Sequence, residues 1–399
     1  MSRNLGIERL QALQSRMGFV DLAAKPVETD DLRELVDLCN YCALCSCPDI
    51  RASIIEAKTR FVERDGLALG PRLLEDVARM GKLCGLFPQL MNRMLANGRT
   101  GRLLKRVAGI HEDRRLPILP GASFDAWARR QGLMQKPAPG AANKVAYFAG
   151  CSGRYLYPEV PQALVHVLQH AGIQVYVPDQ QCCGMPTLLE GDRKKTLAFM
   201  AANVERLSAL VAEGFTIVCS CPTCGYMLKN ALPEFAYYSQ AYQDFIGGDE
   251  RNMIIPNKMP AQTANTGQCG IPAQYQATFG GHHVASKTVE VAEAAGGSTR
   301  KVALRVLDKS IYGKILKDDG YFSSIDPLKR IRVAENTHDL GEYLLGLHRH
   351  GELDTRLGPN HGRKAYYPPC HLREQEIGQP YLDSQGFFGD LDIIEFPFF

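Results

Sequence analysis

The sequence predicts an α/β fold in which a parallel sheet follows a helical N-terminal part. Between residues 144 and 235, three short apolar runs alternate with two amphipathic segments, each closed by a glycine, as strands and helices do in a parallel sheet. Between residues 50 and 110, apolar side chains instead recur at helical spacing. A chain of 399 residues is long enough for two or three domains, each with its own core.

The N-terminal part is expected to be mainly helical. Residues 1–30 suggest a helix with a polar lead-in, and a second helix is expected over 50–64. Residues 77–110 carry basic side chains and no acidic ones among their apolar residues. The basic residues are Arg79, Lys82, Arg93, Arg99, Arg102, Lys105 and Arg106. Gly121 and the Pro/Gly-rich stretch 137–140 indicate a linker before the sheet.

The sheet and the segments after it are expected in the following order. Strands are predicted at 144–150, 173–177 and 215–218, and helices at 160–171 and 193–213. Residues 236–320 are richer in Gly, Gln, Asn and Ala, which suggests an insertion; they contain Cys269 and the pair His282–His283. A helix at 340–347 and a strand at 364–367 are then predicted.

Composition narrows the function classes. The net charge of +3 gives no support for nucleic-acid binding, and no apolar run approaches the length of a membrane-spanning helix. The N-terminal residues lack a secretory apolar core, so a cytoplasmic location is expected. Thirteen cysteines in such a chain point to metal ligation rather than disulfides, with zinc and iron–sulfur clusters as the alternatives.

The first cysteine group resembles a bacterial ferredoxin run. It consists of Cys39, Cys42, Cys45 and Cys47, followed by Pro48. Four cysteines within nine residues fit an iron–sulfur cluster better than zinc, which normally uses two separated pairs. The single residue before Cys47 departs from the usual three, so either Cys47 or Cys84 would complete the ligand set. Cys84 is otherwise expected to be a buried free thiol.

The second group has one cysteine motif after each predicted strand. Its members are Cys151, Cys182, Cys183, Cys221 and Cys224. Ligands bind beyond the carboxyl ends of parallel strands, so the three loops should converge with five thiolates. Gly184 would let the backbone approach closely, and Cys219 is a spare ligand candidate.

This arrangement resembles the cysteine-rich CCG domain of the heterodisulfide reductase B subunit and the iron–sulfur C subunit of anaerobic glycerol-3-phosphate dehydrogenase. The second resemblance extends to the ferredoxin run, the basic region, the stretch 111–117, Phe124 and Trp127. It implies a helical ferredoxin-like part, a CCG domain, an insertion and an incomplete second CCG-like module. The corresponding domain ranges are 1–65, 66–140, 141–235, 236–320 and 321–399. The chain departs from many relatives in having one ferredoxin run and the insertion.

The resemblance also implies cofactors and partners. A 4Fe-4S cluster would bind at Cys39–Cys47, and a noncubane 4Fe-4S cluster at the CCG motif. A flavoprotein dehydrogenase would supply electrons, which would pass toward menaquinone, because this sequence has no flavin or nicotinamide motif of its own. The alternatives are a heterodisulfide reductase-like disulfide reductase and a zinc-stabilised interaction protein. The basic region would contact the inner membrane surface or a partner, or would pack on the sheet with its arginines solvated.

A second CCG-like module is expected to start at residues 366–372, where Cys370 and His371 follow two prolines. Cys182 lies 31 positions after Cys151, and the same spacing from Cys370 passes Phe399, the last residue. We therefore expect a module that stops short. A UGA selenocysteine codon read as a stop, a shortened clone and gene decay are the alternatives.

Overall fold

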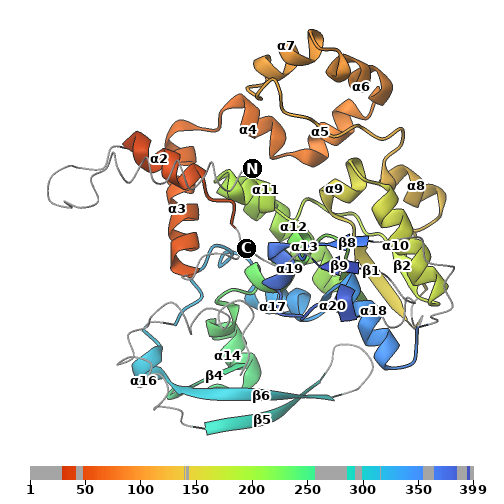
Figure 1. Cartoon of the computed structure of the whole chain (residues 1–399). Coiled ribbons are helices and arrows are strands. Elements are labelled where there is room, and N and C mark those ends of the chain that lie inside the picture. Colours follow the sequence, from red (N-terminus) through yellow and green to blue (C-terminus); the bar gives the residue numbers. More distant parts are fainter. Residues whose placement is uncertain are drawn as a thin grey trace.

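The computed structural model describes residues 29–41, 48–138, 140, 143–256, 285–292, 299–314, 316–353, 364–383 and 393–395. A four-stranded parallel sheet lies at its centre, with strand order β2-β1-β3-β7 (Figure 1). Its strands are β1 (Lys144–Phe148), β2 (Gln174–Tyr176), β3 (Thr216–Cys219) and β7 (Thr337–Asp339). The first three confirm the predicted strands. The fourth has only three residues, of which none is apolar, and therefore gives no sequence signal.

Helices cover both faces of this sheet and form two separate cores. In β1, Val145 and Tyr147 face one core, whereas Ala146 and Phe148 face the other, as strand alternation requires. The first core includes residues of α8 (Phe124–Arg130), α10 (Glu159–His170) and α18 (Leu340–Arg349). The second includes residues of α12 (Arg193–Ala212) and α17 (Pro327–Glu335). Helices α10, α12 and α18 confirm the predicted helices.

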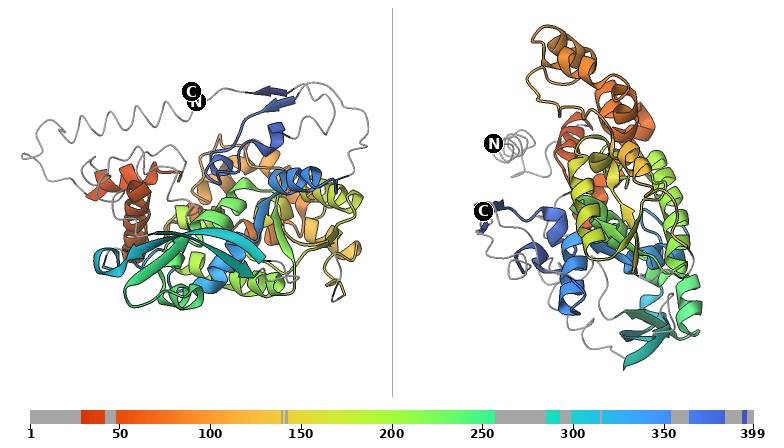
Figure 2. Two further views of the ribbon diagram at one scale, coloured as in Figure 1. Left: turned by 90° about the horizontal axis from the view of Figure 1, so that it is seen from below. Right: turned by 90° about the vertical axis from the view of Figure 1, so that its right-hand side faces the viewer.

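The described N-terminal part is helical, as expected, whereas the helix expected within residues 1–30 lies outside the described residues up to residue 28. Its helices are α2 (Thr29–Asp37), α3 (Pro48–Asp65), α4 (Leu69–Leu74), α5 (Val77–Cys84), α6 (Pro88–Ala96) and α7 (Thr100–Val107). The basic region is divided among α5, α6 and α7, since α5 ends at Gly85 and α6 begins at a proline in its first turn. Figure 1 and the right-hand view of Figure 2 show α6 and α7 projecting at the end of the molecule opposite the strands at residues 285–292 and 299–308. Helix α6 buries none of its residues.

The range expected to be an insertion contains an antiparallel sheet. Its strand order is β4-β6-β5, with β4 (Asn252–Pro256), β5 (Ala285–Ala292) and β6 (Thr299–Asp308). The helices η2 (Ala236–Tyr238), α14 (Gln240–Ile246) and α16 (Lys309–Tyr312) accompany it. Cys269 and the pair His282–His283 lie outside the described residues.

The C-terminal part forms a small parallel sheet. Strand β8 (Lys364–Tyr366) confirms the predicted strand and pairs in parallel with β9 (Ile393–Glu395). The short helices α19 (Cys370–Arg373) and α20 (Pro380–Asp383) follow β8. Within the described part of the chain, no helix combines the length and apolarity needed to cross a membrane.

Candidate metal centre

Three loops at the carboxyl ends of β1, β2 and β3 carry the five cysteines of the second group. Cys151 lies in α9 (Gly150–Tyr155), directly after β1. Cys182 and Cys183 follow β2 and precede α11 (Met185–Leu189), whereas Cys221 and Cys224 follow β3 at α13 (Pro222–Tyr226). The expected convergence of three loops at one edge of the sheet is confirmed.

The sulfur atoms of these cysteines contact one another. The Sγ atoms of Cys182 and Cys151 lie 3.6 Å apart. Cys183 interacts with Cys182 and Cys224, and Cys224 interacts with Cys221. Cys151, Cys183, Cys221 and Cys224 line a cavity of about 330 Å³. Among the described residues, no three His, Cys, Asp or Glu side chains are spaced to hold a single metal ion.

Two of the thiols have lowered pKa values. Hydrogen bonding with Cys224 lowers the pKa of Cys221 to about 6, and backbone N–H groups of Cys224 and Thr223 contribute. Hydrogen bonds with Cys182 and Cys224 also lower the pKa of Cys183. Because the thiolate is the form that binds metal, this environment favours ligation by Cys183 and Cys221. Hydrogen bonding with neighbouring cysteines and burial instead raise the pKa of Cys151, Cys182 and Cys224.

Two glycines with positive φ lie beside the cysteines, and a side chain at either would crowd its neighbours. Gly150 has φ +67°, and a Cβ atom there would lie 2.8 Å from the Sγ of Cys224. Gly184, next to Cys183, has φ +83°, and a Cβ there would lie 3.2 Å from Cγ2 of Thr196. Any side chain at Gly150 would displace Cys224, so the backbone is fitted to a set of closely placed sulfurs. The donor set and this close approach fit an iron–sulfur cluster.

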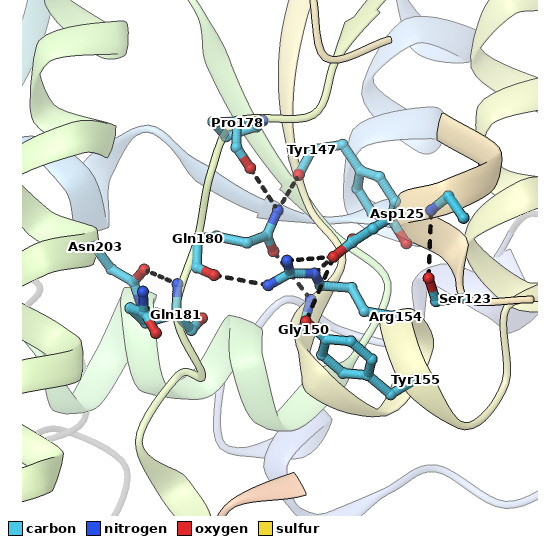
Figure 3. Close-up of polar contacts among 11 residues, drawn as sticks. Ser123, Asp125, Tyr147, Gly150, Arg154, Tyr155, Pro178, Gln180, Gln181 and Asn203 are labelled. Carbon is cyan, nitrogen blue, oxygen red and sulfur yellow. Dashed lines mark hydrogen bonds and ion pairs between the residues drawn. The ribbon is translucent and has the colours of Figure 1, made fainter. Parts of the chain in front are cut away.

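Polar side chains fix the first two cysteine loops to each other (Figure 3). The amide of Gln180 donates to the carbonyl of Tyr147 and accepts from the N–H of Gly150, next to Cys151. Asn203 of α12 donates to the carbonyl of Cys182 at 3.0 Å. It also accepts from the N–H of Gln181 at 2.8 Å. Both amides are buried, so these loops have fixed backbone paths.

An ion pair between α9 and α8 supports the same loops. Arg154 of α9 binds both carboxylate oxygens of Asp125 through its Nε and Nη2 atoms and donates from Nη1 to the carbonyl of Gln180 at 2.7 Å (Figure 3). Ser123 caps α8, which carries Asp125, by accepting from the N–H of Ala126. Helix α8 is thereby connected to the cysteine loops. None of these polar residues has a sequence signal, because their partners are distant in the chain.

Only Cys39 of the first cysteine group lies within the described residues; Cys42, Cys45 and Cys47 lie outside them. Its Sγ accepts a hydrogen bond from the N–H of Tyr41 at 3.5 Å. Lys58 of α3 donates to the carbonyl of Cys39 at 3.1 Å and to that of Leu189, at the end of α11, at 2.9 Å. Lys58 therefore joins the start of the first group to α11, the helix that follows Cys183.

The remaining described cysteines lie apart from the cavity lining. Cys84 ends α5 as a free thiol; it is half-buried rather than buried, and its partial burial raises its pKa. Cys219 is fully buried in β3, and burial raises its pKa well above the ordinary value. Cys370 is half-buried at the start of α19.

Residues from the helical region also line the cavity. They are Leu74, Glu75 and Arg114. Glu75 is 2% exposed and pairs with Lys195 at 3.0 Å; burial raises the pKa of this carboxyl. These residues were not among the predicted site residues, since nothing in their local sequence indicates contact with the CCG loops.

Comparisons with known proteins agree with this geometry. Residues 145–229 match the profile of the CCG family, described as "Cysteine-rich domain". The C subunit of the anaerobic glycerol-3-phosphate dehydrogenase of Escherichia coli K12 is 27% identical over 157 residues, which cover 39% of each chain. The B subunit of the fumarate reductase (CoM/CoB) of Methanothermobacter marburgensis is 34% identical over 107 residues, covering 26% of this chain and 21% of that protein. An uncharacterized iron-sulfur protein of Methanococcus maripaludis is 30% identical over 92 residues, covering 23% and 18%.

The similarity is confined to part of each relative. The chain spans less than two fifths of the length of these three proteins in the aligned regions. No solved structure matches significantly. The matched region nevertheless contains all five cysteines at the carboxyl ends of the strands.

Proposed function

We propose that this chain is an iron–sulfur electron-transfer subunit of an oxidoreductase complex. The observation that carries the proposal is that three loops bring five cysteines into mutual contact beside one cavity, which four of them line. The match to the cysteine-rich domain and the names of the relatives, which include an iron-sulfur protein and subunits of a dehydrogenase and a reductase, support it.

Two cluster sites follow from the cysteine groups. A 4Fe-4S cluster is assigned to Cys39, Cys42, Cys45 and Cys47. A noncubane 4Fe-4S cluster is assigned to Cys151, Cys182, Cys183, Cys221 and Cys224, because five thiolates exceed the four that a cubane needs. Bound clusters supply one-electron redox chemistry. The protein itself holds the thiolates together, restricts solvent around them and fixes the cysteine loops of the second group to one sheet.

The electron donor is proposed to be a flavoprotein dehydrogenase subunit and the acceptor a quinone such as menaquinone. A catalytic partner is needed because the chain lacks a nucleotide-binding fingerprint of its own. The location proposed is the cytoplasm, with peripheral contact at the inner face of the cell membrane.

The surface that would make this contact is formed by α5, α6 and α7. Their exposed apolar side chains are Leu83, Leu86, Phe87, Leu90, Leu103 and Val107. The basic side chains named above lie on the same helices. A basic and apolar surface suits anionic lipid. Sedimentation with anionic vesicles at low and high salt tests it: Arg93→Glu with Arg99→Glu should reduce binding, whereas Arg129→Glu with Arg130→Glu on α8 should not.

The central experiment is anaerobic purification with iron and sulfide quantitation and EPR spectroscopy. About eight irons per chain are expected for two 4Fe clusters. Cys183→Ser should lose the CCG cluster, whereas Cys84→Ser, which removes a thiol outside the site, should retain all the iron. A colourless protein containing zinc would contradict the proposal and support the zinc-stabilised alternative.

A second candidate function is disulfide reduction, as expected of a heterodisulfide reductase-like protein. The observation that favours it is Glu75, whose second carboxyl oxygen is buried and has no hydrogen-bond partner among the described residues. Reduction of a disulfide to two thiols takes two electrons and two protons, and a carboxyl lining the cavity is placed to supply a proton. The dithionite-reduced protein should then release thiols from an added disulfide, whereas an electron carrier alone should not.

A further inference from the structure

His371 contacts one residue beside each of the two groups of cysteines. Its Nε2 lies 2.9 Å from the carbonyl of Tyr41, the residue that stands between Cys39 and Cys42 in the sequence. Its Nδ1 lies 3.0 Å from the hydroxyl of Thr223, which stands between Cys221 and Cys224. One imidazole ring therefore joins the loop of the first group to the loop of the second.

The two contacts define how the ring is protonated. The Tyr41 carbonyl can only accept, so Nε2 must carry a hydrogen and donate it. Burial lowers the pKa of His371, which favours the neutral ring with Nδ1 as an acceptor for the Thr223 hydroxyl. The imidazole ring therefore hydrogen-bonds to one loop through each of its two nitrogens and holds the two loops at a fixed distance.

Aromatic rings fill the same space. His371 stacks on Tyr226, with centroids 5.0 Å apart and an interplanar angle of 13°. Tyr226 in turn meets the ring of Tyr41 edge-on, with centroids 6.1 Å apart. The space between the two loops is therefore occupied by packed rings, which exclude water from it.

The helix that carries His371 is itself anchored on both sides. Arg51 of α3 pairs with Glu374 at 2.9 Å, and both side chains are buried. Gln375 donates to the carbonyl of Pro222 at 3.0 Å, and Asn230 donates to that of Glu374 at 3.1 Å. The segment after Cys370 is consequently held against the N-terminal helix and the CCG loops together.

We infer that His371 is a positioning residue that holds the two cluster-binding loops in register and so sets the rate of electron transfer between them. This inference rests on the proposed function. If both groups hold clusters, one electron at a time would pass between the two sites, with no bond made or broken and no proton transferred; the part of His371 would be to position the loops. The rate of electron transfer falls steeply as the distance between two redox centres grows. If the first loop detached at Tyr41, electron transfer between the two sites would therefore slow.

Two amide variants separate the two contacts of the ring. In His371→Gln the amide reaches the position of Nε2 and can still donate to Tyr41. In His371→Asn the shorter amide reaches only the position of Nδ1, so the contact to Tyr41 is lost and that to Thr223 is retained. His111→Asn is the control, because His111 is 77% exposed and lies outside this region of contacts.

Three measurements on the full chain follow: hydrogen exchange of the peptide at residues 38–48, spin–spin interaction in the EPR spectrum of the fully reduced protein, and the rate of electron equilibration between clusters. In His371→Asn, amide exchange of that peptide should rise about tenfold, as expected for one lost hydrogen bond. The spin–spin interaction should weaken and the equilibration should slow. His111→Asn should resemble the wild type in all three, and His371→Gln should resemble it in the amide exchange, because it keeps the contact to Tyr41.

Unchanged exchange and spin–spin interaction in a fully iron-loaded His371→Asn protein would overturn the inference. If both variants failed to fold while His111→Asn folded, His371 would serve the stability of the fold rather than the positioning of the loops, and the inference would also fail. A wild-type protein that lacks one cluster would instead refute the proposed function; the hydrogen-exchange comparison needs no cluster and would still decide the role of His371.

Discussion

Replacing Gly150 by alanine should remove the CCG cluster while leaving the fold in place. The new Cβ would lie 2.8 Å from the Sγ of Cys224, a separation at which one of the two atoms must move. The neighbouring N–H of Gly150 is bonded to the buried amide of Gln180, so the backbone is restrained and the sulfur should yield. A displaced Cys224 would leave the cavity with an incomplete set of thiolates.

The stability change can be separated from the change at the cavity. At φ +67°, an alanine costs about 1–2 kcal/mol because its Cβ crowds the carbonyl in the left-handed region. Gly172 is a matched control: it has φ +73°, but a Cβ there would meet nothing within 4 Å. Both variants should therefore lose about 1–2 kcal/mol of unfolding free energy from backbone strain alone.

The assay compares iron, acid-labile sulfide and EPR signals after anaerobic reconstitution of wild type, Gly150→Ala and Gly172→Ala. We expect about eight irons per chain in the wild type and in Gly172→Ala, and about four in Gly150→Ala. Urea unfolding of the apoproteins should show similar losses for both variants. Equal iron content in the two variants would refute the idea that the approach of Gly150 to Cys224 shapes the site.

Three further predictions concern the supporting structure. Burial raises the pKa of Asp339 to about 6, so the fold favours its neutral form, and stability present at low pH is lost as the pH rises through 6. Asp339→Asn, which retains an N-cap side chain, should therefore gain about 1 kcal/mol over the wild type between pH 5 and 8 in urea titrations. Arg51→Met should lose about 3 kcal/mol, because it leaves Glu374 buried without its partner; adding Glu374→Gln should recover part of this loss in a double-mutant cycle. Asn203→Ala should lose about 1–3 kcal/mol and slow cluster reconstitution, since two backbone groups beside Cys182 lose their partner; unaltered reconstitution would contradict this.

The sequence predicted the part of the fold that has local patterns. Strands β1, β2 and β3 are apolar and short, and α10, α12 and α18 are periodic, so each could be placed along the chain. The position of the five cysteines at one sheet edge followed from general rules of parallel sheets. Strand β7 was missed because it is polar and has three residues.

What the sequence could not provide are contacts between distant segments. His371 and Tyr41 are 330 positions apart, and Arg51 and Glu374 are 323 apart. The strands β5 and β6 did have alternating apolar residues, such as Val302, Leu304 and Val306, but a region rich in small and polar residues obscured them. Long-range packing decides such contacts, and one sequence contains no record of it.

The pairing of β3 with β7 has a consequence for the newly synthesised chain. Ile217 pairs with Thr337, so the partner of β3 on that side is translated 120 residues later. At ribosomal rates this is a delay of about 6–24 s, during which the edge of β3 that pairs with β7 has no native neighbour. An uncovered strand edge can pair with other chains and so lead to aggregation. A chaperone that binds nascent chains ending before residue 337 should therefore suppress aggregation. Released chains that end at residue 330 and at residue 345 would be compared for that dependence.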